Sequence, residues 1–225
     1  MRTLPIFPLG SVLLPGMPIA LRIFEERYVV MLSRLLEQDR AEFGVVLIER
    51  GSEVGGGDER FGLGTVAHIT SCDVKQGWIS VVAVGDRRFE VVEWLPDDPH
   101  PRARIRWLPR LDWSPALAPL RDTAEVAVRR TLARASEYSD QQWPVDVALD
   151  DDPVIAAWQL AGIAPLGPLD KVQLLRATTM RELLTRVQGL TEAAADMLEL
   201  VGLDDLSMPP APDRDAGNPQ GVDEP

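Results

Sequence analysis

The sequence predicts an α+β protein in which a β-rich part, residues 1–112, is followed by a helical part, residues 113–205. β-branched runs bounded by glycine and proline fill the first part, and this pattern is typical of strands. Beyond Trp113 apolar residues recur at spacings of three and four, as on one face of a helix. With 225 residues, 45% of them hydrophobic, the chain can bury a core without metal or disulfide support, and its single cysteine, Cys72, cannot form an internal disulfide.

Five runs in the β-rich part predict strands, at residues 43–49, 64–74, 78–85, 88–94 and 103–108. One helix is expected to interrupt them, from Phe24 to about residues 38–40. Its apolar residues recur at helical spacing and place one stripe against the sheet: Phe24, Tyr28, Met31, Leu32, Leu35 and Leu36.

The helical part is expected to open with a helix whose apolar face holds Leu117, Leu120, Ala124, Val128, Thr131, Ala135 and Tyr138. Asp152 followed by Pro153 predicts a second helix, because an acidic N-cap with proline at the next position favours a helix start. Pro168 predicts a third helix in the same way. Thr179 and Glu182 form a T-x-x-E capping box for a last helix, which keeps an apolar side until Gly202.

Charge restricts the partners and the end of the chain. The net charge is −12, which opposes the phosphate attraction that supplies most non-specific affinity for nucleic acid. Residues 206–225 are acidic and proline-rich and hold few large apolar residues, so this tail is expected to be disordered. Prolines interrupt the apolar start of the chain, and no apolar run approaches the roughly 20 residues of a membrane span. We therefore expect a soluble, cytoplasmic protein without membrane contact.

The sequence contains no recognisable catalytic motif, and no metal or cofactor is predicted. A phosphate-binding loop is absent, and Gly55–Gly57 precede two acidic residues, which favours a hairpin loop over a phosphate cradle. His68 is expected to be an ordinary strand residue. His100 lies in a proline-locked turn with acidic neighbours but without a second nitrogen or sulfur ligand nearby, which disfavours a metal site.

A basic stripe is predicted on the run at residues 102–107. Arg102, Arg104 and Arg106 alternate with apolar residues, so the three arginines share one face of a strand. This face is interpreted as a solvated edge that discourages strand pairing between molecules. Contact with an anionic partner is the alternative.

Several motifs in order along the chain resemble the Lon protease N-terminal domain family. GLGTVAHI and VGDRRFEV match the G-T-x-A and G-x-x-R-F strands of that family, and LGPLDKVQLLRA resembles its helix with Lys-x-x-Leu-Leu. The opening of the chain follows the family pattern of prolines and glycine at Leu4, Pro5, Pro8, Leu9, Pro15, Gly16, Met17, Phe24, Glu26 and Arg27. The resemblance covers about residues 3–203.

The resemblance implies a PUA-like β pseudo-barrel with one or more helices, followed by an α-helical subdomain. In full-length Lon this domain helps to capture protein substrates. The chain contains neither the Walker motif nor the Ser-Lys region of Lon, so no ATPase or protease activity is expected. It resembles a stand-alone substrate-binding domain, which implies a non-enzymatic module that recognises polypeptide segments as an adaptor or regulator in protein quality control.

A groove between barrel and helices is the expected binding site, because concavities between structural units often bind ligands. The candidate residues follow the PGMP turn or supply aromatic anchors: Met17, Arg22, Phe24, Glu25, Arg27, Trp94 and Trp107. Two alternatives remain open. PUA-like barrels elsewhere bind RNA, for which the arginine stripe would serve, and a small ligand in an aromatic pocket is the other possibility.

Overall fold

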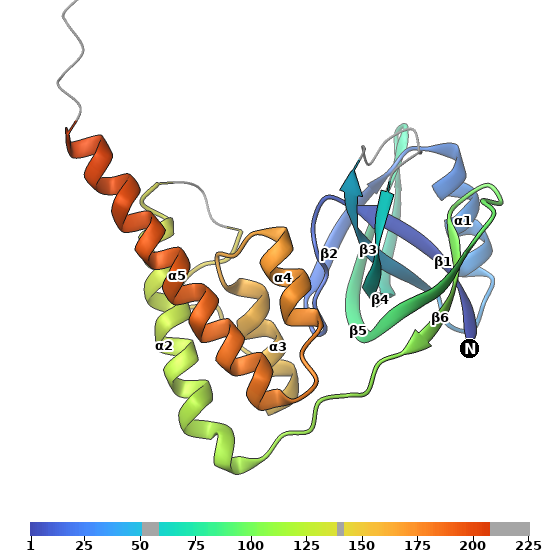
Figure 1. The fold of residues 1–225 in the computed structure, drawn as a ribbon. Helices are drawn as coiled ribbons and strands as arrows, with labels where there is room; N and C mark the ends of the chain where they lie inside the picture. Colours follow the sequence, from blue (N-terminus) through green and yellow to red (C-terminus); the bar gives the residue numbers. More distant parts are fainter. Residues whose placement is uncertain (51–58, 139–141, 208–225) are drawn as a thin grey trace, which may run out of the picture.

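The computed structural model describes residues 1–50, 59–138 and 142–207 (Figure 1). Within these residues six strands form one mixed sheet: β1 Arg2–Leu9, β2 Pro18–Ile23, β3 Glu42–Arg50, β4 Glu59–Lys75, β5 Trp78–Leu95 and β6 Arg102–Trp107. The predicted hairpin loop at residues 55–57 and residues 208–225 of the predicted tail lie outside the described residues. The first two residues of that tail, 206 and 207, instead belong to the last helix, Met180–Ser207. The strands that flank this loop, β3 and β4, pair antiparallel.

The sheet closes into a barrel because β6 pairs with both β1 and β5. Around the ring, β1 pairs parallel with β3, and β3, β4 and β5 follow as antiparallel neighbours. β2 pairs with the first half of β5, from Pro18↔Val84 to Ile23↔Ile79. A small cluster of buried side chains fills the barrel: Leu4, Ile6, Val46, Val66, Phe89, Ala103 and Ile105.

The sequence did not predict two of the strands, β1 and β2. Proline lacks the N–H that a strand ladder needs, and β1 contains Pro5 and Pro8 while β2 begins at Pro18. β1 nevertheless forms because it pairs with β6 over Arg2–Pro5 and with β3 over Ile6–Leu9. The predicted strands at residues 78–85 and 88–94 are one continuous strand, β5.

The helix of the β-rich part, α1, spans Glu26–Leu36 and is shorter than expected. Tyr28, Met31, Leu32 and Leu35 are buried as predicted, but Phe24 is 58% exposed and Leu36 is 53% exposed. Placing Phe24 on the buried stripe was wrong. It precedes the N-cap Glu25, whose backbone is extended, so Phe24 does not share the helical face.

The helical part contains the short 3₁₀ turn η1 Pro115–Leu117 and the helices α2 Ala118–Ala135, α3 Pro153–Ile163, α4 Pro168–Leu175 and α5 Met180–Ser207. The Asp152 carboxylate caps α3 by accepting hydrogen bonds from the N–H groups of Val154 and Ile155, as predicted. Thr179 accepts from the Glu182 N–H at 3.1 Å, as predicted. The Glu182 carboxylate accepts from the Thr178 N–H at 2.7 Å, and a weaker contribution from the Thr179 N–H also lowers the pKa of Glu182. The sequence predicts that this last helix ends near Gly202, but α5 continues to Ser207.

One continuous hydrophobic core joins the barrel to the helices. Residues of β2 and α1 belong to the same buried cluster as residues of α2, α3, α4 and α5. Met17 packs directly on Gly162 of α3, since a Cβ atom at position 162 would lie 2.4 Å from the Met17 sulfur. The predicted α+β fold class, a PUA-like pseudo-barrel followed by a helical subdomain, is confirmed.

Arg88 links the barrel to the helical part through hydrogen bonds. It stands on β5, is buried, and its guanidinium donates to the carbonyls of Leu175 and Ala177, each at 2.6 Å, and of Pro109 at 2.8 Å. Desolvation by burial lowers the pKa of Arg88 to about 10, and the charge of Glu182 partly offsets this effect. The end of α4 and the chain after β6 are therefore held to the same side chain.

Candidate functional site

Three depressions meet along the contact between β2 and the helical part. The first, about 470 Å³, lies beside β2 and is lined by Ile19, Arg22, Phe24, Glu25, Tyr28 and Gln142, among others. The second, about 200 Å³, lies between the chain at Ser11–Ile19 and the segment from α3 to α4. The third, about 530 Å³, continues from that segment to α5.

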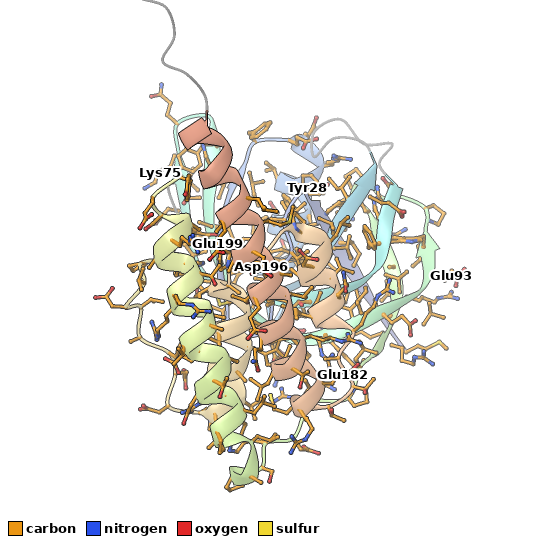
Figure 2. All side chains as sticks on the ribbon, turned by 60° about the vertical axis from the view of Figure 1, so that its left-hand side comes forward. Tyr28, Lys75, Glu93, Glu182, Asp196 and Glu199 are labelled. Atoms are coloured by element: carbon orange, nitrogen blue, oxygen red, sulfur yellow. The ribbon has the colours of Figure 1, made fainter. Side chains whose placement is uncertain are left out.

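Shared lining residues make these depressions one surface feature, which we call the β2–α5 channel. Gln142 borders all three depressions. Ile19 joins the first to the second, and Trp143 and Lys171 join the second to the third. In Figure 2, which brings the helices forward, α5 runs along the near side with Glu182 towards one end and Glu199 towards the other.

Exposed apolar side chains lie at both ends of the channel. Phe24 is 58% exposed at the β2 end, and Met197 of α5 is 69% exposed at the other end. Between them Leu13, Met17 and Leu166 supply apolar surface in the second depression, beside the polar side chains of Ser11 and Gln142. Burial of apolar surface by a ligand in this channel would be favourable.

Four of the seven predicted binding residues line the channel: Met17, Arg22, Phe24 and Glu25. Met17 is buried and forms part of the wall, whereas Arg22 and Phe24 are exposed. The Arg22 guanidinium stacks over the Trp78 ring at 4.4 Å. Arg27 is next to the channel, where it donates to the Glu25 carboxylate at 3.1 Å and stacks over Tyr28.

The structure does not bring Trp94 or Trp107 to the channel. Trp94 lies on β5 opposite Ala103 of β6, with the Arg60 guanidinium 5.2 Å from its ring. Trp107 packs partly against the small barrel core and carries the Arg87 guanidinium at 4.5 Å. Both tryptophans are therefore engaged with the barrel, away from Phe24.

The arginine stripe on β6 is neutralised by its neighbours. Arg104 and Arg106 are exposed and alternate with buried Ala103 and Ile105. Arg104 pairs with Glu93 of β5 at 2.7 Å and Arg106 with Glu90 (Figure 2 labels Glu93). Arg102 pairs with Asp98 at 3.3 Å. Each guanidinium of the stripe thus faces a carboxylate.

Sequence reasoning missed Gln142, Trp143, Lys171 and Met197 as lining residues of the channel. Trp143 lies between α2 and α3 in a segment without a motif of its own. Lys171 belongs to the Lys-x-x-Leu-Leu motif, which predicts a helix but not a place in the channel. Met197 was assigned to the apolar side of the last helix, but that helix end is exposed.

A second groove, about 420 Å³, lies between β5 and α3 and contains none of the predicted residues. Its lining is more charged than the channel and includes Asp86, Arg87, Arg110 and Asp150. Arg110 pairs with Asp86 at 3.1 Å. The Asp150 carboxylate accepts from the Asp152 N–H at 2.9 Å, and the Arg87 guanidinium lies over the Trp107 ring.

Both histidines contact neighbouring polar groups of the protein. The His68 ring lies between two carboxylates, 3.3 Å from Glu42 and 3.2 Å from Asp86. His100 is buried, its Nδ1 is 3.1 Å from the Pro101 carbonyl, and desolvation lowers its pKa. Within residues 1–50, 59–138 and 142–207, no three His, Cys, Asp or Glu side chains are grouped for a metal ion. No described helix is both long and apolar enough to cross a membrane.

A closed barrel packed on helices, with a channel along the contact, offers the kind of concave surface at which ligands often bind. The family model for the ATP-dependent protease La (LON) substrate-binding domain matches residues 3–192. The chain belongs to this family.

Known proteins similar to this chain include Lon proteases. Lon protease 2 of Herpetosiphon aurantiacus is 25% identical over 202 residues, covering 88% of this chain and 24% of that protein. Lon protease of Escherichia coli K12 is 25% identical over 207 residues, covering 88% of this chain and 25% of that protein. The chain thus spans about a quarter of the length of these curated relatives.

Solved structures of Lon N-terminal domains share the fold. The Lon N-terminal domain protein from Xanthomonas campestris superposes with a TM-score of 0.59 at 26% identity, covering 84% of this chain and 98% of that chain. The N-terminal domain of Mycobacterium avium complex Lon protease gives a TM-score of 0.60 at 17% identity. This match covers 85% of this chain and 98% of that chain. The second likeness concerns the fold alone.

Proposed function

We propose that the protein is a non-enzymatic module that binds polypeptide segments in the β2–α5 channel, as an adaptor or regulator of protein quality control in the cytoplasm. The observation that carries this proposal is the continuous run of three depressions with exposed Phe24 and Met197 at its ends. Membership of a substrate-binding domain family supports it. A series of linked depressions suits a chain with successive side chains better than one compact small ligand.

The composition of the channel favours apolar segments. Its apolar walls offer surface whose burial stabilises a complex, while Arg22, Gln142 and Lys171 supply a few polar contacts that can orient the bound chain. Phe24 is the exposed aromatic side chain of this surface, and aromatic residues are enriched among the side chains that dominate binding energy. It is the residue to test first.

Replacing Phe24 with alanine should weaken the binding of an apolar peptide by at least about 1 kcal/mol. The reason is the loss of an aromatic contact surface at the β2 end of the channel. Fluorescence anisotropy with a labelled, unstructured apolar peptide at two salt concentrations measures the effect, and salt should change the affinity little. Trp94→Ala is the matched control, since it removes a partly exposed aromatic residue outside the channel.

This proposal fails if Phe24→Ala and Trp94→Ala weaken peptide binding equally, or if the wild-type protein binds no unstructured peptide. Circular dichroism of each variant must first show an unchanged helix and strand content. Phe24 is largely exposed, so its loss is expected to leave folding intact.

RNA binding by the arginine stripe is not expected. Arg102, Arg104 and Arg106 are paired with carboxylates, and the whole chain is strongly acidic. A short single-stranded RNA titrated at low and physiological salt should show no saturable binding. Salt-sensitive binding, with a log-log slope of about −0.7 per phosphate contact and loss in the triple alanine variant of the stripe, would contradict this expectation.

A further inference from the structure

Lys171 occupies an unusual place in the β2–α5 channel. It lies on α4, is half-buried, and lines both the second and the third depression. Its ammonium group donates to the carbonyl of Gly162 at 3.0 Å, in the last turn of α3. An ammonium has three N–H donors, so this hydrogen bond leaves further donors available in the channel.

No carboxylate forms an ion pair with Lys171 in the part of the chain that the structure describes. Its neighbour Asp170 lines the third depression only, and that carboxylate is the acceptor for the Gln173 amide. Among the described residues that line the second depression, Lys171 is the one with a charged side chain. Burial without a compensating charge lowers the pKa of Lys171.

We propose that Lys171 anchors a carboxylate of the bound polypeptide, so that the channel selects segments in which a carboxylate lies next to apolar side chains. This inference rests on the proposed function and adds the chemistry of the substrate. The carboxylate would meet the Lys171 ammonium in the second depression, while apolar neighbours of the bound segment pack against Met17, Ile19 and Leu166.

Charge complementarity argues for this occupant. A buried cation without a partner is costly, and a bound carboxylate removes this cost by forming a charge-assisted hydrogen bond away from bulk water. The Gly162 carbonyl, at the negative end of α3, accepts a hydrogen bond from the ammonium, and this contact favours the charged form. The other end of the channel holds a second cation, Arg22, for which the described residues provide an aromatic ring rather than an ion pair.

The net charge of −12 does not prevent acidic segments from binding. Exposed charges act over a Debye length of about 8 Å at physiological salt, and the carboxylates closest along the channel, Glu25 and Asp170, have partners of their own. Among the described residues that line the second depression, Lys171 carries the one charge, so a carboxylate bound there meets an ammonium first. An apolar peptide without a carboxylate would leave this cation desolvated and unpaired.

Two kinds of carboxylate share this chemistry, the C-terminal carboxylate of a chain and an Asp or Glu side chain. Three labelled peptides separate them: an apolar hexapeptide with a free C-terminus, the same peptide with an amidated C-terminus, and the amidated peptide with one internal Glu. Fluorescence anisotropy with the wild-type protein compares their affinities. We expect at least one carboxylate-bearing peptide to bind about tenfold or more tightly than the amidated one.

Lys171→Met should abolish this preference, since it removes the cation that pairs with the carboxylate, and the ratio of the affinities for the carboxylate-bearing and amidated peptides should fall to about one. Lys75→Met is the matched control, because Lys75 is the other lysine and lies at the hairpin of β4 and β5 (Figure 2). It should keep the preference. Melting curves of both variants verify that they fold.

Equal affinities for all three peptides in the wild-type protein would overturn the inference while leaving peptide binding in place. A carboxylate preference that survives in Lys171→Met would overturn it as well, because another cation would then carry the selectivity. If none of the peptides binds, both this inference and the proposed function fail. Retention of the preference in Lys171→Arg, which keeps the charge, would support a charge contact over a purely structural role.

Discussion

Arg88→Met should lower the free energy of unfolding by about 3 to 5 kcal/mol, because it leaves buried carbonyl groups without donors. The guanidinium now satisfies the carbonyls of Leu175, Ala177 and Pro109 at once. Methionine fills a similar volume but donates no hydrogen bond. Lysine at this position keeps a charge but cannot reach three acceptors in the same geometry. Arg88→Lys should therefore lower the free energy of unfolding, but by less than Arg88→Met does.

Urea unfolding followed by circular dichroism measures this effect. Arg104→Met is the matched control, since Arg104 also lies on a barrel strand but forms an exposed ion pair with Glu93. Exposed pairs contribute about 1 kcal/mol or less, so the control should lose little stability. Equal losses in the two variants would show that Arg88 does not fasten the barrel to α4 in the way its contacts indicate.

The second large effect is expected from Gly64→Ala on β4. A Cβ atom at this position would lie 2.1 Å from the Val45 carbonyl oxygen and 2.8 Å from the Phe89 ring. The first of these is a backbone atom of the paired strand β3 and cannot move without disturbing the ladder. Adding a methyl group to such a packed site costs about 3 kcal/mol or more.

Gly62→Ala provides an internal comparison, because it lies two residues earlier on the same strand and no heavy atom lies within 4 Å of its added Cβ. Its melting temperature should stay within a few degrees of the wild type. For a chain of this length, a loss of about 1 kcal/mol in the free energy of unfolding lowers the melting temperature by roughly 2 to 4 °C. The Gly64→Ala variant should therefore melt at least about 6 °C below the wild type, or fail to accumulate in soluble form. Similar melting temperatures for both variants would contradict the steric argument.

Local signals in the sequence were sufficient for most helices. The start of α3 could be predicted because Asp152 and Pro153 act on the first turn alone, and the structure shows the cap. β1 and β2 could not be predicted in the same way. Their prolines suppress the local strand signal, and the strands form because β3, β5 and β6 supply partners from distant positions.

The residues of the candidate site likewise divide into those that local sequence predicts and those that depend on tertiary packing. Arg22, Phe24 and Glu25 were found from the sequence because they follow one turn and stay together in space. Trp94 and Trp107 were chosen for their residue type, which does not indicate the face on which a side chain lies. Trp143 and Lys171 join the channel only through the packing of the helical part on the barrel, and a single sequence contains no signal for that contact.

The packing of Met17 on Gly162 also affects how a ligand would bind. Both walls of the channel belong to one continuous core, so they are preorganised and do not have to close around a ligand. The conformational entropy lost on association then comes mainly from the bound segment. Association of a ligand would accordingly be limited by diffusion and orientation rather than by an opening step, and differences between ligands should appear chiefly in their dissociation rates.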